Sequence, residues 1–325
     1  MIYIDFFDHK KLVEAFRKLY LDDRDELIRL SLEAAKQDNC VLYFVEQTGI
    51  QIDTIDVGDV YIHCKHITTA IDNLESIKQS GLITLNRVID ERAPLTRFLE
   101  DHKIFFDIPN RVVRYNSKNF NLPYSEDECR ECFYETNCQH NTDILSNYTS
   151  VTYRDLACTF RRGINNLRST LYHDLGEIEV FLAGNDKDIH NYSTIKSHPE
   201  ILYTIERMIN KLFEKKVSLC QDWLSHTNGN YYCLDFDVNI KDFEQSTTSS
   251  YYHDSVPLLN HCQRNYISLE DANVDFHMNS FILFAGIPLL AFEENTIYGQ
   301  LLPHIEIPYE CITLTEYNIT ESFGA

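Results

Sequence analysis

The sequence contains no apolar run that approaches the about 18 residues needed to cross a bilayer. It begins MIYIDFFD, without the basic leader and small-residue cleavage site that are typical of a secretory signal. We therefore expect a cytoplasmic protein without membrane association. In that compartment the ten cysteines are expected to be reduced thiols or metal ligands rather than a disulfide framework.

The sequence also lacks internal repeats, low-complexity tracts and Gly/Ser-rich linkers. Its 325 residues, of which 44% are hydrophobic, are enough to form a large packed core. Without a tether between two halves, the chain is expected to form a single compact α+β domain with insertions.

Basic residues are scarce as well, with 29 Lys and Arg against 50 Asp and Glu and a formal net charge of -21. This balance disfavours general electrostatic binding of nucleic acid, although a local basic patch could overrule it, and it suits a basic protein partner. The motifs GxxxxGK[ST], GxGxxG, GxSxG and HExxH are absent, so the sequence does not favour the usual nucleotide-binding, hydrolase or zinc-protease sites.

The periodicity of apolar residues predicts helices in the first forty residues, with a break at Asp22-Asp23. A helix over 71–81 is expected to end at Gly81. A further helix is expected from Ser197, because Ser197 and Glu200 form a capping-box pattern. Strands are predicted around 50–55, 60–66, 177–183, 231–238, 280–284 and 301–307. Residues 103–115 predict a strand, a turn that contains the proline, and then either a short helix or a second strand.

His66 and Thr68 form a His-x-Thr pattern at the end of one predicted strand, just before the predicted helix. Side chains at the end of a strand can face a cleft. A lone histidine in that position is more often a hydrogen-bonded core residue, so the pattern gains weight only from its neighbourhood.

The stretch HITTAIDNLESIKQSGL, residues 66–82, resembles the first motif of the ADP-ribosyltransferases. It is most similar to the DarT-type toxins that modify DNA bases, and more distantly to the poly(ADP-ribose) polymerases. This resemblance implies NAD as co-substrate and a split β-sheet core. It also implies that His66 and Thr68 hold the ribose of NAD.

The stretch KIFFDIPNRVVRY, residues 103–115, resembles the aromatic strand of the same family. By that resemblance Phe105 or Phe106 stacks on the nicotinamide and Tyr115 closes the other side. Arg111 falls where the DNA-modifying toxins carry a functional arginine, so it is expected to act in catalysis by facing the acceptor. Flat aromatic rings and a guanidinium suit these roles, although a core strand with two solvated arginines would give the same pattern.

The stretch LLPHIEIP, residues 301–308, is the best match to the strand that carries the catalytic glutamate of the family. Strand alternation would place Leu302, His304 and Glu306 on one face. Glu306 is therefore the expected catalytic acid, which would stabilise the oxocarbenium-like transition state. The family commonly has its glutamate four residues before such a proline, where this chain has His304, so Glu294 and Glu310 remain alternatives.

These motifs divide the chain into three parts. Residues 1–58 are expected to be an N-terminal helical extension, and residues 59–120 with 175–325 an ADP-ribosyltransferase-like core. Residues 121–174 are expected to be a Cys-rich and helical insert.

The insert carries thiols and an imidazole at spacings that suit a metal. Cys129, Cys132, Cys138 and His140 could hold a structural zinc ion in a tetrahedral site, with Cys158 or His173 as replacements for His140. An insert of unliganded thiols is the alternative. A closed site of this kind would stabilise the insert and take no part in catalysis.

The resemblance implies an enzyme that transfers ADP-ribose from NAD to a nucleic-acid base, in DNA or RNA, with a protein target as the alternative. We expect a toxin of a toxin–antitoxin or phage-defence system, held by an antitoxin or chaperone partner. Two other readings remain open. One is a non-catalytic acidic protein-binding module, and the other is a HEPN-like ribonuclease that uses Arg168 and His173.

Overall fold

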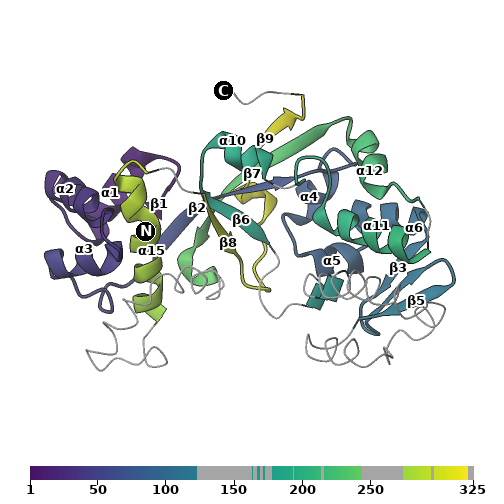
Figure 1. Ribbon diagram of the computed structural model, residues 1–325, viewed down its shortest axis with the longest axis horizontal. Coiled ribbons are helices and arrows are strands. Elements are labelled where there is room, and N and C mark those ends of the chain that lie inside the picture. The colour runs from purple at the N-terminus through teal and green to yellow at the C-terminus, as the bar shows by residue number, and fades with distance from the viewer. Residues whose placement is uncertain are drawn as a thin grey trace.

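A six-stranded sheet runs through the middle of the molecule in this computed structural model (Figure 1). Its strand order is β8-β6-β2-β7-β9, and β1 pairs in parallel with the start of β2, while the other pairs are antiparallel. The molecule is therefore of the mixed α+β class, as predicted. The strands are β1 Ile2–Ile4, β2 Val60–Thr68, β6 Glu179–Ala183, β7 Asn230–Asn239, β8 Ile297–Gln300 and β9 Thr313–Asn318.

The structure describes residues 1–122, 163, 167–168, 171–172, 178–192, 194–213, 216–243, 274–293 and 296–320. Within this part of the chain, no helix combines the length and the apolar character that a membrane span requires.

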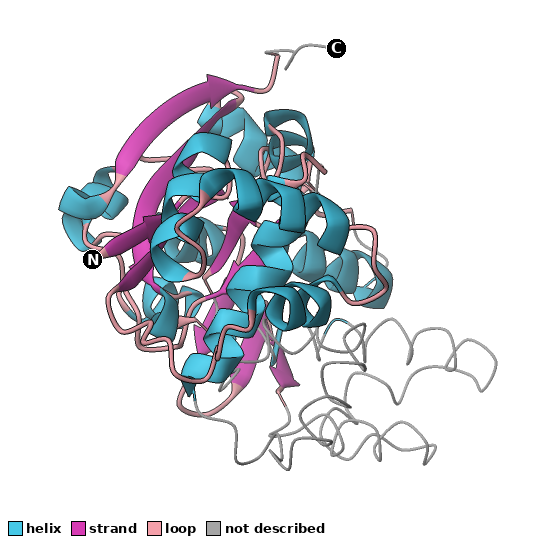
Figure 2. Cartoon of the chain, turned by 90° about the vertical axis from the view of Figure 1, so that its left-hand side faces the viewer, coloured by secondary structure: helices cyan, strands magenta, loops and turns pink. Residues whose placement is uncertain are grey.

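A group of helices packs at one end of the sheet, and Figure 2 views the molecule from that end. Side-chain oxygens of Asp8, Asp23 and Asn39 accept hydrogen bonds from the first free N–H groups of three of these helices, which explains where they begin. The helices predicted in the first forty residues are thus confirmed, including the break at Asp22-Asp23. The group consists of α1 His9–Leu19, α2 Arg24–Ala34, α3 Cys40–Thr48 and α15 Val274–Leu290.

The expected strand at 280–284 is wrong, because these residues lie inside α15. The helix is apolar on all sides and packs against α1, α2 and α3, so its sequence shows no helical period. A continuous apolar run of this kind is compatible with either a buried strand or a buried helix.

A second hydrophobic core lies at the other end of the sheet (Figure 1). It joins a small three-stranded sheet, of order β3-β4-β5, to four helices. The strand and turn predicted within 103–115 are confirmed, and of the two alternatives for the residues after the turn the structure has the second strand, β4, and not the short helix. These elements are β3 Ile104–Asp107, β4 Val112–Tyr115, β5 Lys118–Asn121, α5 Leu85–Asp90, α6 Pro94–Asp101, α11 Glu200–Phe213 and α12 Leu219–Thr227.

The predicted helix after Ser197 is confirmed as α11, but the capping box does not form. The Ser197 hydroxyl donates a hydrogen bond to the carbonyl of Thr194, three residues earlier, and the helix begins at Glu200. The side chain of Glu200 therefore does not serve as part of a capping box. Other short helices among the described residues are α10 Asp186–Asn191, the 3-10 helix η1 Ile240–Asp242 and the 3-10 helix η2 Tyr309–Cys311.

The helix expected over 71–81 is present only in its second half, as α4 Glu75–Ser80. Asn73 and Leu74 have positive φ angles of 53° and 64°, so the chain turns before the helix begins. Gly81 ends it with φ 73°, and the two backbone hydrogen bonds between Leu82 and Ile307 follow at once. A Cβ at position 81 would lie 2.2 Å from the carbonyl oxygen of Ile307, so only glycine fits there.

Two more predicted strands are wrong. The segment 50–55 consists of turns and bends after α3. The segment 301–307 has single bridges at its two ends, Leu301 to Phe243 and Ile307 to Leu82, with a turn between them. Each end has its own partner and Pro303 has no N–H, so no continuous ladder forms.

Candidate functional site

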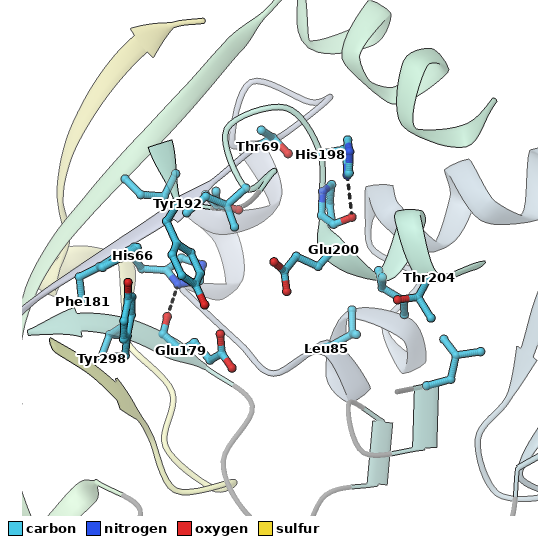
Figure 3. A pocket seen from close by; sticks show the side chains of 17 residues that line it. His66, Thr69, Leu85, Glu179, Phe181, Tyr192, His198, Glu200, Thr204 and Tyr298 are labelled. Atoms are coloured by element: carbon cyan, nitrogen blue, oxygen red, sulfur yellow. Dashed lines mark hydrogen bonds between the residues drawn. The ribbon is translucent and has the colours of Figure 1, made fainter. Parts of the chain in front are cut away.

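Two adjoining cavities lie at the end of β2, between the central sheet and the second core. The smaller has a volume of about 370 Å³ and the larger about 510 Å³. The residues that line both cavities are His66, Thr68, Thr69, Leu85 and Pro199. The residues of the His-x-Thr pattern therefore lie where the two cavities meet. Figure 3 shows His66 in the smaller cavity.

The ring of His66 is held by a hydrogen bond of 2.7 Å between its Nδ1 and the backbone carbonyl oxygen of Glu179 (Figure 3). A carbonyl only accepts, so Nδ1 carries the hydrogen and Nε2 is left as the acceptor. Burial lowers the pKa of His66 below its ordinary value, although the bond to the carbonyl opposes this shift. The neutral ring therefore offers an acceptor nitrogen at the cavity.

His63 lies on the opposite face of the same strand, and its pKa is shifted in the opposite direction to that of His66. Its Nδ1 lies 2.9 Å from Asp237 and its Nε2 lies 3.5 Å from Asp235. Hydrogen bonds to Asp235 and then to Asp237 raise the pKa of His63 to about 9, so this ring is charged at neutral pH. His63 does not line either cavity.

An aromatic cluster of Phe181, Tyr192 and Tyr298 forms part of the wall of the smaller cavity. The ring centroids of Tyr192 and Tyr298 are 4.9 Å apart, and Phe181 lies 5.2 Å from Tyr298. These contacts hold flat ring faces beside His66 (Figure 3). Such faces can stack on a planar or cationic ring.

Two carboxylates, those of Glu179 and Glu200, also enter the smaller cavity, one from β6 and the other from the start of α11 (Figure 3). The Nε2 atom of Gln300, opposite on β8, donates a hydrogen bond of 3.1 Å to Oε1 of Glu179. Glu179 therefore orients the ring of His66 through its backbone and places an acid beside that ring through its side chain.

The pairing between β2 and β6 is short. Within these two described strands, Lys65 opposite Phe181 is the only register pair. Next to it, the ring of His66 adds a hydrogen bond to the backbone carbonyl of Glu179. Both His66 and Glu179 line the smaller cavity, which therefore lies beside this short pairing.

The larger cavity extends from this junction past α4 and α6. Arg92 and Arg97 are the cationic side chains among its described lining residues. The indole of Trp223 closes its inner wall and donates a hydrogen bond of 2.9 Å from Nε1 to the hydroxyl of Thr69. Arg92 is itself paired with Glu100. The cavity therefore combines an aromatic wall with two guanidinium groups and three carboxyl groups, those of Asp72, Glu75 and Glu91.

The structure does not bring the other predicted NAD-binding residues to these cavities. Phe105 is 41% exposed on β3, and Tyr115 is buried in the second core, and neither lines either of these two cavities. Of the expected cofactor-binding set, His66 and Thr68 are the residues that line them. The aromatic residues that accompany them are Phe181, Tyr192 and Tyr298 in the smaller cavity and Trp223 in the larger.

Arg111 also lies away from the cavities, at the turn between β3 and β4. Its guanidinium carbon is 3.8 Å from the ring centre of Tyr172, and its Nε donates to the carbonyl of Leu122. The backbone at Arg111 has a φ of 55°. These contacts hold the side chain against the second core.

Glu306 forms an ion pair with Arg87 and lines neither cavity. The strand alternation on which its placement rested does not exist, because 301–307 is not a strand. Of the two alternatives, Glu310 lies in η2 and also outside the cavity walls, and Glu294 lies outside the described residues.

The predicted zinc ligands Cys129, Cys132, Cys138 and His140, with the replacements Cys158 and His173, lie outside the described residues, so the zinc site stays a prediction. In the part of the chain that is described, no group of three or more His, Cys, Asp or Glu side chains could hold a metal ion. The HEPN-like pair stays equally untested, because its histidine, His173, is outside that part as well.

No family model, curated protein or solved structure matches this chain.

Proposed function

We propose that the chain is an NAD-dependent ADP-ribosyltransferase with an ADP-ribosyltransferase-like split sheet, and that its NAD site lies across the two adjoining cavities. The observation that carries this proposal is the neutral ring of His66, fixed with Nε2 as acceptor beside an aromatic cluster and two carboxylates. This set has the chemistry that a ribose joined to a cationic ring requires.

The nicotinamide half of NAD suits the smaller cavity. The pyridinium ring of oxidised NAD is flat and positively charged, so Tyr192 and Tyr298 can stack on it while Glu179 and Glu200 balance its charge. The ribose hydroxyl can donate to Nε2 of His66. Reduced NAD has a neutral, puckered ring and would gain less from the same groups.

The adenosine diphosphate half suits the larger cavity, which begins at the same residues. Its volume of about 510 Å³ is in the range of ordinary ligand sites. Arg92 and Arg97 supply cations for an anionic group, and Trp223 supplies an aromatic wall.

In the proposed reaction the bond between the ribose C1′ and the nicotinamide nitrogen breaks, and its electron pair leaves with the nicotinamide. The ribose carbon becomes cationic, and a carboxylate in the cavity stabilises that charge. The acceptor then forms a bond to C1′ and releases its proton. Glu179 is the carboxylate we assign to this role, because Gln300 holds it beside His66.

The resemblance to DarT-type toxins supports a nucleic-acid base as the acceptor, which would have to be unpaired or flipped out of a duplex. The net charge of -21 supports a protein acceptor instead. We keep the base as the proposed acceptor, and we propose a toxin held by an antitoxin or chaperone partner. Both proposals come from the family resemblance.

The test is transfer of label from adenylate-labelled NAD to single-stranded DNA, to RNA and to lysate protein, together with release of nicotinamide. Glu179→Gln is expected to lower transfer about 100-fold or more, because it removes the stabilising charge. Glu306→Gln is the matched control, since Glu306 lies outside both cavities, and it should retain transfer.

Loss of transfer in Glu306→Gln but not in Glu179→Gln would return the catalytic role to Glu306. A loss in Glu200→Gln alone would assign it to α11. If the unaltered chain neither transfers label nor releases nicotinamide with any acceptor, the proposed activity is wrong, and the acidic binding module becomes the better explanation.

A further inference from the structure

Thr69 is a buried polar residue that faces both cavities, just after the end of β2. It is only 7% exposed, and it is not part of the His-x-Thr pattern. Its hydroxyl accepts the hydrogen bond from Nε1 of Trp223 at 2.9 Å. A hydroxyl that is fixed in this way at a ligand-sized cavity can form a directed hydrogen bond to a bound ligand.

The direction of that hydrogen bond bears on whether Thr69 can donate a hydrogen bond to a ligand. An indole N–H can only donate, so it occupies a lone pair of the Thr69 oxygen and leaves the hydroxyl hydrogen for another partner. The Thr69 hydroxyl therefore keeps its hydrogen to donate, with one lone pair also remaining, whereas the carbonyl of Glu179 sets His66 as an acceptor. The two residues stand three positions apart along the chain and offer opposite polarity to one ligand.

Trp223 is well placed to keep this direction. It is 2% exposed in the second core, and the ring of Phe98 packs edge-on against it with centroids 5.1 Å apart. A buried indole N–H requires an acceptor, and Thr69 provides it. The bond therefore links the second core to the end of β2.

We propose that the Thr69 hydroxyl, oriented by Trp223, donates a hydrogen bond to the diphosphate of a bound nucleotide where the two cavities meet. This inference rests on the proposed function and deepens it by assigning Thr69 to ligand binding and Trp223 to positioning. A phosphate oxygen only accepts, so it complements the hydrogen that the Thr69 hydroxyl still has to donate. In a dinucleotide the diphosphate lies between the two nucleosides, which corresponds to the junction between the cavities.

The test measures the affinities of ADP-ribose and adenosine by titration calorimetry, because these two ligands differ by the diphosphate and the second ribose. Thr69→Val keeps the shape of the side chain but loses the hydroxyl, so we expect ADP-ribose to bind about tenfold more weakly. Adenosine should change less than twofold. Thr69→Ser retains the hydroxyl and should restore ADP-ribose binding.

Trp223→Phe tests the positioning role, since it removes the N–H while keeping an aromatic ring. It should weaken ADP-ribose binding by a smaller factor than Thr69→Val, and it should weaken adenosine binding, whose proposed wall Trp223 forms, by a smaller factor still. Melting temperatures of all variants would show whether the second core is intact, and the ratio of the two affinities reports on the hydroxyl independently of stability.

Unchanged ADP-ribose affinity in Thr69→Val would overturn the inference and leave the proposed function standing. Equal losses for ADP-ribose and adenosine, or no recovery in Thr69→Ser, would also overturn it, because they indicate a purely structural threonine. If the unaltered chain binds no ADP-ribose, the proposed function and this inference fall together.

Discussion

The imidazole of His66 donates through Nδ1 to a backbone carbonyl, so its chemistry is set by a partner 113 residues away along the chain. Burial lowers its pKa, and the ring is neutral at pH 7 with Nε2 as an acceptor. A solvent-exposed histidine would gain its proton at about pH 6.5. At the pH where an exposed histidine would be half protonated, the lowered pKa therefore leaves a smaller fraction of His66 protonated.

We therefore predict that the affinity for NAD stays constant as the pH falls from 8 to about 6.5 and declines only at lower pH, where Nε2 becomes protonated. His66→Gln should remove this dependence together with most of the affinity. Calorimetric titration of NAD across the pH range is the measurement. His63→Gln is the matched control on the other face of β2, and it should leave the profile unchanged. A decline centred above pH 7 would contradict the assignment of a neutral His66.

Gly81 ends α4, and the next residue, Leu82, pairs with Ile307. Its φ of 73° disfavours any residue with a Cβ, and that Cβ would lie 2.2 Å from the Ile307 carbonyl oxygen. This pairing connects the residue after α4 to a segment that lies far away in the sequence. The close approach, rather than the angle alone, makes the position demanding.

We predict that Gly81→Ala lowers the free energy of unfolding by roughly 2 to 4 kcal/mol, from the strained angle and the steric conflict together. Gly49→Ala is the control, because Gly49 has a similar φ of 67° but no atom within 4 Å of the new Cβ. It should cost only about 1 kcal/mol. Urea denaturation of both variants measures the difference, and equal losses would show that Ile307 moves aside freely.

Asn279 of α15 connects, through hydrogen bonds, segments that are far apart in the chain. Its side-chain nitrogen donates to the carbonyls of Ile52, Ile55 and Asp275, and its oxygen accepts from the hydroxyl of Tyr20 at 2.9 Å. Asn279 is fully buried. It therefore connects the N-terminal helices and the approach to β2 with a helix from the last part of the sequence.

We predict that Asn279→Leu, which keeps the volume, lowers the free energy of unfolding by about 3 to 5 kcal/mol, because buried carbonyls and a buried tyrosine hydroxyl lose their partners. Ser280→Ala is the control, since its hydroxyl bonds only within its own helix to Phe276. Hydrogen exchange should also become faster in α1 and α2 in the asparagine variant. Equal stabilities of the two variants would contradict this role.

Local sequence signals were enough for elements whose pattern shows on one face. The alternation over 60–66 predicted β2, and the periodicity of the first forty residues, with aspartates at its breaks, predicted α1 and α2. The same reasoning was wrong for 280–284, where burial on every side removes the period, and for 301–307, where two ends pair with different partners.

The local sequence was enough to predict that His66 and Thr68 lie at the end of a strand, because side-chain alternation is a property of neighbouring residues. The groups that face them could be identified from the tertiary structure alone. Glu179, Tyr192, Glu200 and Tyr298 come from β6, the segment after α10, α11 and β8, and long-range packing brings them to one cavity. Glu200 fitted a helix cap in the sequence equally well. The physical reason is that a local pattern fixes the direction of a side chain, whereas its partner depends on which distant surfaces bury each other.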